Sequence, residues 1–396
     1  GGVGGAAGPP PLVTFLDLPR PCICALGPLV AHLERFGMAR ALSQPELRHF
    51  SQEAYMTLDA VTLRDLEVLE CQQDGREAGS LLALLNRTAT PFGSRQLRQW
   101  VRHPLLRRED VLARQDAVEE LAETPPAAVE RLRPLLRDAR DLDPAIASLH
   151  HRRIQPSRLL GLLRVMKKVA SAFQTPGQAP SSPAGLATGG GTEPAPASRV
   201  LRDALEVFPS GLLALAERFL AELRPEEAGQ DDVTGALVSG EALCPALREA
   251  KEKEKEAKAG LEAELRRVRG VLRKPSLQFR TLRTGVTSQL EYLVEVRKSE
   301  VKKLVPSDWV QVSQTKEVSR FHTPAVLALS QELLQAREMK VVSAKDAWGA
   351  LVKQVDEAAY DAFRRALQAL GTLDALLSLV AVSRLPGYVR PVYPVE

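Results

Sequence analysis

The sequence predicts a mainly α-helical protein with long helical arms and one small inserted β-containing unit. Apolar residues recur every three or four positions over most of the chain, which is the period of an amphipathic helix. Aromatic residues make up only 5% of the chain, as in cores packed with Leu, Ala and Val. Within residues 261–324 the period changes to two, as a half-buried strand requires. The alternating apolar residues there are Leu290, Tyr292, Val294 and Val296.

The length and composition allow two or three domains with a substantial core, since 44% of the 396 residues are hydrophobic. No apolar run approaches the ~20 residues of a membrane span, so we expect no membrane partner. Four scattered cysteines suggest a reducing compartment. Because Cys22 and Cys24 match no common zinc spacing with His150 and His151, we interpret the cysteines as small buried hydrophobic residues and predict no metal site.

The N-terminal region is expected to form the end of an α/β unit. Residues 1–11, rich in Gly and Pro, are interpreted as a disordered lead-in. Residues 12–50 combine a short apolar run with a stretch of helical period, in which Leu29, Leu33 and Phe36 would share one face.

Residues 51–260 are predicted to form a helical domain. Leu97 and Trp100 lie one turn apart and are expected in its core. The segment Thr90-Pro91-Phe92-Gly93 is expected to break the helical pattern, and further prolines are expected to punctuate it. These are Pro125, Pro126, Pro134, Pro144 and Pro156. Ten of the 25 residues 174–198 are Pro or Gly, which predicts a disordered insertion.

Two long helices are predicted to flank the β-containing unit. Before it, a Lys-Glu run is typical of an exposed helix, with the pairs Lys251–Glu254, Glu252–Lys255 and Glu254–Lys258. This helix is expected to stop at Pro275. After the unit, helix resumes at Ala325, and an apolar stripe continues from Trp348 to Val380, which predicts a rigid arm.

The inserted unit is strongly basic. From Arg266 to Arg320 it carries thirteen Lys or Arg against five Asp or Glu, a net charge of +8, whereas the whole chain carries +4. Such a surface predicts contact with a polyanion, and the alternative is an ordinary solvated surface. Arg297 and Lys298 are weaker candidates for that contact, because Glu295 or Glu300 could pair with them.

Two stretches resemble a known family. The first runs from Leu66-Glu67-Val68-Leu69 through Gly79-Ser80-Leu81-Leu82, Thr88, Thr90, Phe92-Gly93, Arg95, Leu97 and Trp100 to Pro104-Leu105. The second is Trp309-Val310-Gln311-Val312 with Thr315-Lys316 and Val318-Ser319-Arg320-Phe321-His322. Together they resemble the core, lever and clamp regions of MutS-type DNA mismatch-repair proteins. Leu272-Arg273-Lys274-Pro275-Ser276 and the Ser319–His322 segment resemble most, within this family, the third eukaryotic MutS homologue, the subunit specialised for insertion/deletion loops.

The resemblance implies a domain plan and a DNA-binding clamp. The implied parts are a connector remnant (12–50), core and lever helices (51–260), a clamp (261–324), returning lever helices (325–390) and the start of an ATPase domain (391–396). The clamp would close on duplex DNA and touch phosphates rather than bases. The cations expected to contact phosphates are Arg273, Lys274, Arg280, Arg283, Lys302, Lys303, Lys316 and Arg320.

The resemblance further implies DNA with insertion/deletion loops as substrate, a heterodimer with the second eukaryotic MutS homologue, and the nucleus as compartment.

The sequence departs from the family in two respects. Asp65 stands where Asn is usual, and no Gly-Lys pair occurs, so a Walker A loop cannot form. We therefore expect this chain to be no enzyme and to hold no cofactor, with ATP and Mg²⁺ belonging to the family's ATPase domain. That domain and the mismatch-binding domain are expected to lie outside this chain.

Two other interpretations stay open. One is a structural or meiotic MutS relative that clamps DNA junctions without reading mismatches. The other is a helical interaction scaffold whose basic tip meets an acidic protein.

Overall fold

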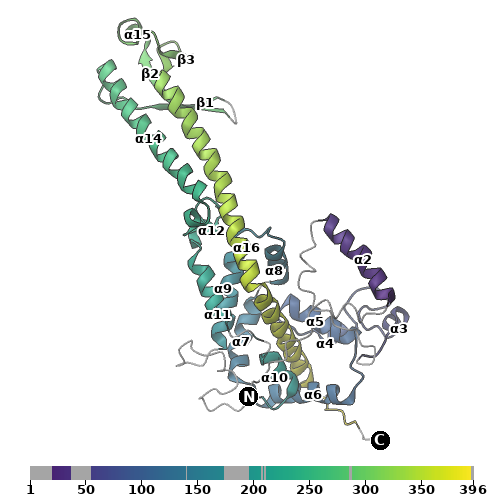
Figure 1. Ribbon diagram of the computed structural model, residues 1–396. Coiled ribbons are helices and arrows are strands. Elements are labelled where there is room, and N and C mark those ends of the chain that lie inside the picture. The colour runs from purple at the N-terminus through teal and green to yellow at the C-terminus, as the bar shows by residue number, and fades with distance from the viewer. Residues whose placement is uncertain are drawn as a thin grey trace. The chain divides into compact units, whose positions relative to one another are not determined.

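A computed structural model describes residues 20–36, 55–139, 141–173, 196–206, 208, 211–284 and 288–393 (Figure 1). The chain divides into two compact units, which are described separately. The first comprises Gly1–Leu220 with Val355–Glu396, and the second comprises Ala221–Gln354. The predicted lead-in and all but the last three residues of the predicted insertion lie outside the described residues.

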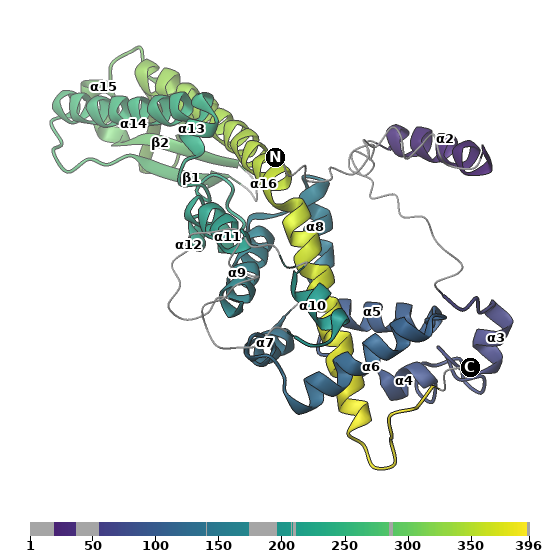
Figure 2. The same ribbon diagram turned by 60° about the horizontal axis from the view of Figure 1, so that its bottom comes forward.

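The first unit is built from helices. They are α2 (Arg20–Arg35), α3 (Ala60–Asp65), α4 (Leu81–Leu85), α5 (Pro91–Arg102), α6 (Arg108–Glu123), α7 (Ala127–Asp138), α8 (Asp143–His150), α9 (Pro156–Ala172), α10 (Arg199–Glu206), α11 (Leu212–Ala221) and the last part of α16 (Pro324–Ser383). Leu82, Leu97 and Ala375 form a buried cluster that joins α4 and α5 to α16 (Figure 2). Leu97 is 1% exposed and is a core residue as predicted, whereas Trp100 is partly buried and packs against this cluster.

Most of the prolines that were expected to interrupt the helical pattern lie where a helix begins. The segment Thr90–Gly93 is the start of α5 rather than a break, because the Thr90 hydroxyl accepts a hydrogen bond from the Gly93 N–H at 3.0 Å and Pro91 occupies the first turn. Pro134, in contrast, lies inside α7 and does not punctuate it. The helix continues through this residue because Leu132 and Leu136 of its apolar stripe are fully buried.

The second unit contains the inserted sheet. Its elements are α12 (Pro225–Gly229), α13 (Gly240–Leu243), α14 (Pro245–Leu272), β1 (Arg280–Thr284), β2 (Ser288–Arg297), α15 (Lys298–Leu304), β3 (Val310–Gln314), β4 (Val318–His322) and the first part of α16. The strands form an antiparallel sheet in the order β1-β2-β4-β3 (Figures 1 and 2). The mainly helical fold with long helices and a small inserted sheet is confirmed.

Strand β2 does not follow the predicted strict alternation of apolar and polar residues. A register shift between β1 and β2 forms a β-bulge near Tyr292, whose φ is +58°. The bulge interrupts the period of two, so that the neighbouring residues Leu293 and Val294 are both buried. Helix α14 ends at Leu272, just before Pro275, as expected.

Helix α16 is apolar enough, by length and composition, to cross a membrane. Its most apolar 18-residue window has a mean hydropathy of 1.6, so the expectation that no such stretch exists is wrong. However, 67% of that window is buried inside the protein, which is how the core helix of a helical bundle behaves.

Candidate nucleic-acid interface

A single apolar core attaches the sheet to the end of α14. Val268 and Leu272 are the last buried residues of that helix, and they belong to one buried cluster with residues of the insertion. The other buried members of the cluster are Val294, Val296, Trp309 and Phe321. Each such side chain contributes about 1.5–3 kcal/mol by leaving water. The sheet is therefore a firmly held platform for the charged residues at its surface.

A buried polar network joins α14 to the start of α16. The Thr323 hydroxyl donates to Glu264 Oε1 at 2.7 Å and accepts from the Val326 N–H at 3.1 Å, so it caps α16. Glu264 also accepts two hydrogen bonds from the Arg267 guanidinium, both at 2.8 Å. The bonds from Arg267, followed by the one from Thr323, lower the pKa of Glu264 against the effect of its burial.

We expect Thr323→Val to destabilise the second unit by about 1–2 kcal/mol, because the isosteric side chain removes the cap of α16 and one of the hydrogen bonds to the buried Glu264 carboxylate. Urea unfolding and hydrogen exchange at the first turn of α16 would measure this loss. Thr281→Val, at an exposed position of β1, is the matched control and should change stability by less than about 0.5 kcal/mol. An equal loss in both variants would contradict the role of the network.

Two of the predicted phosphate-contacting cations are held in ion pairs. Arg320 Nε donates to Glu295 Oε2 at 2.9 Å, and the two residues face each other across β2 and β4. Lys274 pairs with Glu300, and a third carboxylate, Glu291, pairs with Arg337 at 3.4 Å. The Arg320 side chain is only 17% exposed. The Arg320–Glu295 pair thus links two neighbouring strands, whereas the Lys274–Glu300 pair links the turn after α14 to α15.

Arg297 and Lys298 are exposed, and neither pairs with Glu295 or Glu300, the carboxylates that could have neutralised them. Those carboxylates pair with Arg320 and Lys274 instead. Strand register places Glu295 opposite Arg320. The β2–β4 pairing places Arg297 opposite Val318, and the Lys298 N–H donates to the Glu317 carbonyl at 3.0 Å.

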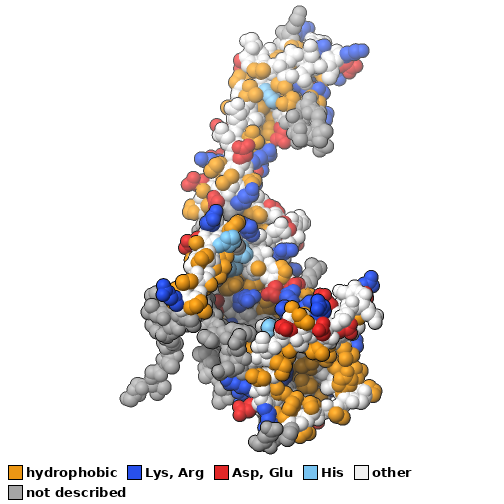
Figure 3. Space-filling view, turned by 90° about the vertical axis from the view of Figure 1, so that its right-hand side faces the viewer, with side chains coloured by type: hydrophobic (Ala, Val, Ile, Leu, Met, Phe, Trp, Pro, Cys, Tyr) orange, Lys and Arg blue, Asp and Glu red, His pale blue; other side chains and the backbone are white. Residues whose placement is uncertain are grey.

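This arrangement gathers exposed cations at one end of the sheet. We call Arg297, Lys298, Lys303 and Lys316 the tip cluster; all four are exposed, and none takes part in an ion pair within the part of the chain that the structure describes. Blue side chains project from this end of the second unit in Figure 3. Arg280 is exposed on β1, whereas the side chains of Arg283 and Lys302 lie outside the described atoms.

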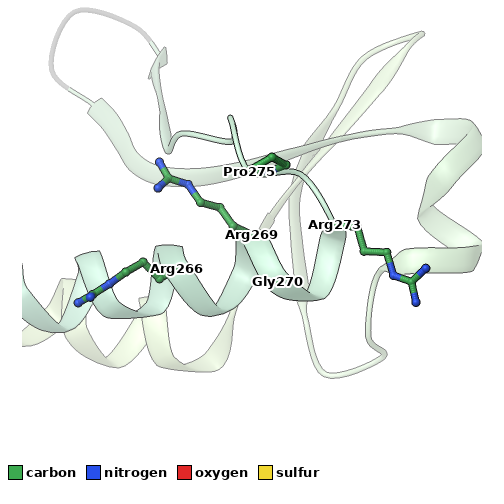
Figure 4. Close-up of a pocket in the computed structure, with 5 residues that line it drawn as sticks. All are labelled: Arg266, Arg269, Gly270, Arg273 and Pro275. Atoms are coloured by element: carbon green, nitrogen blue, oxygen red, sulfur yellow. The ribbon is translucent and has the colours of Figure 1, made fainter.

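A second basic feature lies at the end of α14. Arg266, Arg269, Gly270, Arg273 and Pro275 line an open hollow of about 480 Å³ (Figure 4), which we call the arginine hollow. Arg269 Nε donates to the Leu277 carbonyl at 2.8 Å, which fixes that side chain along the turn. Arg273 has φ +53° and closes the helix, because its N–H and that of Lys274 bond to the Gly270 and Arg269 carbonyls.

Sequence reasoning selected Arg273 alone from this group. The sequence did contain a signal for the other two arginines. Arg266, Arg269 and Arg273 stand at i, i+3 and i+7, a spacing that places them on one face of a helix. The hollow itself depends on the turn after Leu272 and could not be read from spacing.

The lever-like part of the second unit carries a further charge network. Glu254 is buried and accepts hydrogen bonds from Lys258 of α14 and Lys340 of α16, each at 2.7 Å. The predicted Glu254–Lys258 pair is confirmed. The other two predicted pairs are wrong, because Lys251 pairs with Glu241 at 2.7 Å and Glu252 with Arg248 at 3.2 Å.

No group of three or more His, Cys, Asp and Glu that could hold a metal ion occurs among the residues that the structure describes. Cys22 and Cys24 are exposed, so the expectation of buried cysteines is wrong for these two; α2 has no buried residue at all. His150 instead stacks on Tyr360, with ring centres 4.2 Å apart, and its Nδ1 lies 3.0 Å from Asp356 Oδ1.

Comparison with known proteins agrees with these features. Residues 61–380 match MutS domain III. The chain is 30% identical over 380 residues to DNA mismatch repair protein Msh3 of Mus musculus and 34% identical over 399 residues to that of Aspergillus fumigatus. These alignments cover 95% and 96% of this chain but only 32% and 33% of the relatives, so the chain spans about a third of their length. The chain therefore belongs to the MutS family, is similar to Msh3, and carries MutS domain III.

Proposed function

We propose that this chain is the lever and clamp part of a DNA mismatch-repair protein, and that its sheet grips the phosphates of duplex DNA. The observation that supports the proposal most is the tip cluster, whose positive charges are not neutralised by the carboxylates around them. A compact sheet with exposed Lys and Arg attracts a polyanion through its phosphates, independently of base sequence.

The proposed contacts are six exposed cations of the second unit. Four are those of the tip cluster, and the other two are Arg273 and Arg280. Lys274 and Arg320 are left out because their charge is already compensated. If about six phosphates are neutralised, the logarithm of the binding constant should fall with the logarithm of salt concentration at a slope of roughly −5.

The proposal extends to substrate, partner and compartment. The substrate would be duplex DNA with insertion/deletion loops, the partner the second eukaryotic MutS homologue, and the compartment the nucleus. The relatives support the repair function by their names, which state DNA mismatch repair. ATP and Mg²⁺ would be bound by an ATPase domain of such proteins outside domain III, and we assign no catalytic step to the residues of this chain.

The triple variant Lys298→Gln, Lys303→Gln and Lys316→Gln tests the proposal. Each lost phosphate contact makes the slope of log binding constant against log salt concentration less negative by ~0.9. For a labelled homoduplex we therefore expect this slope to become shallower by about 2.7. Fluorescence anisotropy at several salt concentrations would measure it.

The matched control removes the same net charge elsewhere in the second unit, at the exposed residues Lys253, Lys255 and Lys345. This variant should keep the wild-type slope. Equal slopes for the two triple variants, or association that does not depend on salt, would overturn the proposal.

The same assay separates the two other candidate functions. A protein that clamps junctions should prefer a four-way junction over looped and perfect duplexes. An interaction scaffold should keep an acidic protein partner in the presence of excess DNA.

A further inference from the structure

We propose that a surface around Arg114 docks an acidic peptide of a partner protein, with a carboxylate of the peptide on the guanidinium and an apolar side chain beside it. The surface consists of Tyr55, Met56, Leu106 and Arg114, and we call it the Arg114 patch. All four residues belong to the first unit. The inference therefore goes beyond the proposed function and requires no contact with DNA.

Backbone contacts bring the apolar part of the patch together. Tyr55 forms an isolated antiparallel bridge with Leu105, and the Met56 N–H donates to the Pro104 carbonyl at 2.8 Å. Tyr55, Met56 and Leu106 are nevertheless all exposed. Figure 3 shows exposed hydrophobic side chains gathered on one face of the first unit. Large apolar side chains grouped in this way are typical of a protein-binding surface.

The Arg114 side chain is held in place while its charge is left without an ion pair. Its guanidinium lies over the Trp100 ring, 4.0 Å from the ring centre, and this cation–π contact fixes its plane. Burial lowers the pKa of Arg114 to about 10, an effect that Tyr55 and Asp110 oppose only in part. Although Asp110 stands one turn away on α6, no described carboxylate forms an ion pair with Arg114. A largely buried arginine normally has such a partner.

The charge around the patch indicates an acidic ligand. Residues 96–108 include four arginines and no Asp or Glu. Two of these, Arg102 and Arg107, are exposed and form no ion pair with a described residue. A positive surface of this kind favours a partner that carries carboxylates. A guanidinium whose plane is fixed can bind a carboxylate through two parallel hydrogen bonds.

The apolar residues distinguish a peptide from nucleic acid and from a purely structural role. Phosphates would fit the arginines but would leave Met56 and Leu106 uncovered, whereas a peptide can cover both with its own apolar side chains. If Arg114 only shielded Trp100 from water, its stem would suffice. Shielding would not require exposed Tyr, Met and Leu side chains beside it. Tyr, Trp and Arg are also the residues on which protein interfaces depend most.

The test selects random short peptides displayed on phage against the full chain and measures the affinity of the enriched peptides by fluorescence anisotropy. We expect these peptides to combine Asp or Glu with large apolar residues. Arg114→Gln should weaken their binding about thirtyfold, the effect of losing an interface hot spot. Arg164→Gln, at an exposed position of α9, removes the same charge from the same unit and should leave binding unchanged.

Leu106→Ser tests the apolar part of the patch without changing its charge. Because Leu106 is exposed, the melting temperature should stay unchanged, so weaker binding cannot be ascribed to unfolding. We expect the affinity for the enriched peptides to fall about fivefold. Val238→Ser is the matched control, since Val238 is 54% exposed and Leu106 is 53% exposed. It should bind the peptides like the wild type.

The outcomes also separate this inference from the proposed function. Selection that enriches no peptide, or only peptides without Asp and Glu, would overturn it. So would peptides that bind Arg114→Gln and Leu106→Ser as tightly as the wild type, or displacement of the peptides by a labelled homoduplex, which would assign the patch to nucleic acid. The triple variant of the tip cluster should bind the peptides normally, so that either proposal can fail alone.

Discussion

Gly93→Ala is expected to destabilise the first unit by about 3 kcal/mol, an effect at the upper end of overpacking. An added Cβ at residue 93 would lie 2.1 Å from Asp374 Oδ2 and 2.7 Å from Asp374 Cγ. Real atoms do not approach so closely, so either α5 or the aspartate must move. Neither can move without loss, since Gly93 is in the first turn of α5 and the Asp374 side chain is buried against it.

Asp374 is held by the loop that precedes α5. Its carboxylate accepts hydrogen bonds from the Ala89 N–H at 2.9 Å, the Thr90 N–H at 2.8 Å and the Thr90 hydroxyl at 2.5 Å. Ser378, one turn further along α16, donates to the Leu85 carbonyl at 2.7 Å. Displacing the carboxylate would leave the buried Thr90 N–H and hydroxyl without their acceptor, at about 1–3 kcal/mol each. The expected loss therefore comes from broken hydrogen bonds as much as from crowding.

Urea unfolding followed by circular dichroism would measure the loss. Gly371→Ala is the matched control, because its added Cβ would lie 3.6 Å from the Phe92 carbonyl oxygen, an ordinary contact between the same two helices. It should leave stability unchanged or raise it by up to about 1 kcal/mol. A Gly93→Ala protein as stable as Gly371→Ala would contradict the packing described here.

The long helices could be predicted because their period repeats many times. The stripe from Trp348 to Val380 fits a helix and nothing else, and α16 contains all of it. Strand β4 was not predicted because polar Ser319 occupies one of its buried positions, and helix α15 was not predicted because it has only seven residues. Residues such as Ser319 and Phe321 are strand residues because they pair with β2 and β3.

Charge pairing was the least predictable part of the candidate interface. The +8 charge of the insertion is a property of composition, but the choice of which cations remain exposed follows from strand register. Arg320 is neutralised because β4 places it opposite Glu295, whereas Arg297 has Val318 as its cross-strand neighbour and forms no ion pair with a described residue. The exclusion of a side chain at Gly93 could not be predicted either, because the aspartate that excludes it comes from a helix distant in sequence.

Glu254→Gln is expected to destabilise the second unit by about 2 kcal/mol at neutral pH. The bond from Lys258, followed by that from Lys340, holds the pKa of Glu254 at about 2, below its ordinary value of 4.5. The carboxylate is buried and joins α14 to α16, so a neutral amide would lose both ion pairs and leave Lys340 without its partner.

The pH dependence has a definite sign. Because the pKa is lower in the folded protein, the stabilisation is complete above pH 4.5 and is lost as the pH falls toward 2. The difference in unfolding free energy between wild type and Glu254→Gln should therefore be largest at neutral pH and shrink across this window. Taking the difference cancels the titration of other carboxylates. Glu256→Gln, at an exposed position of the same helix, should show little difference at any pH. A Glu254→Gln difference that stays constant from pH 7 to 2 would mean that the carboxylate is not ion-paired in solution, and that α14 and α16 are held together by their apolar contacts alone.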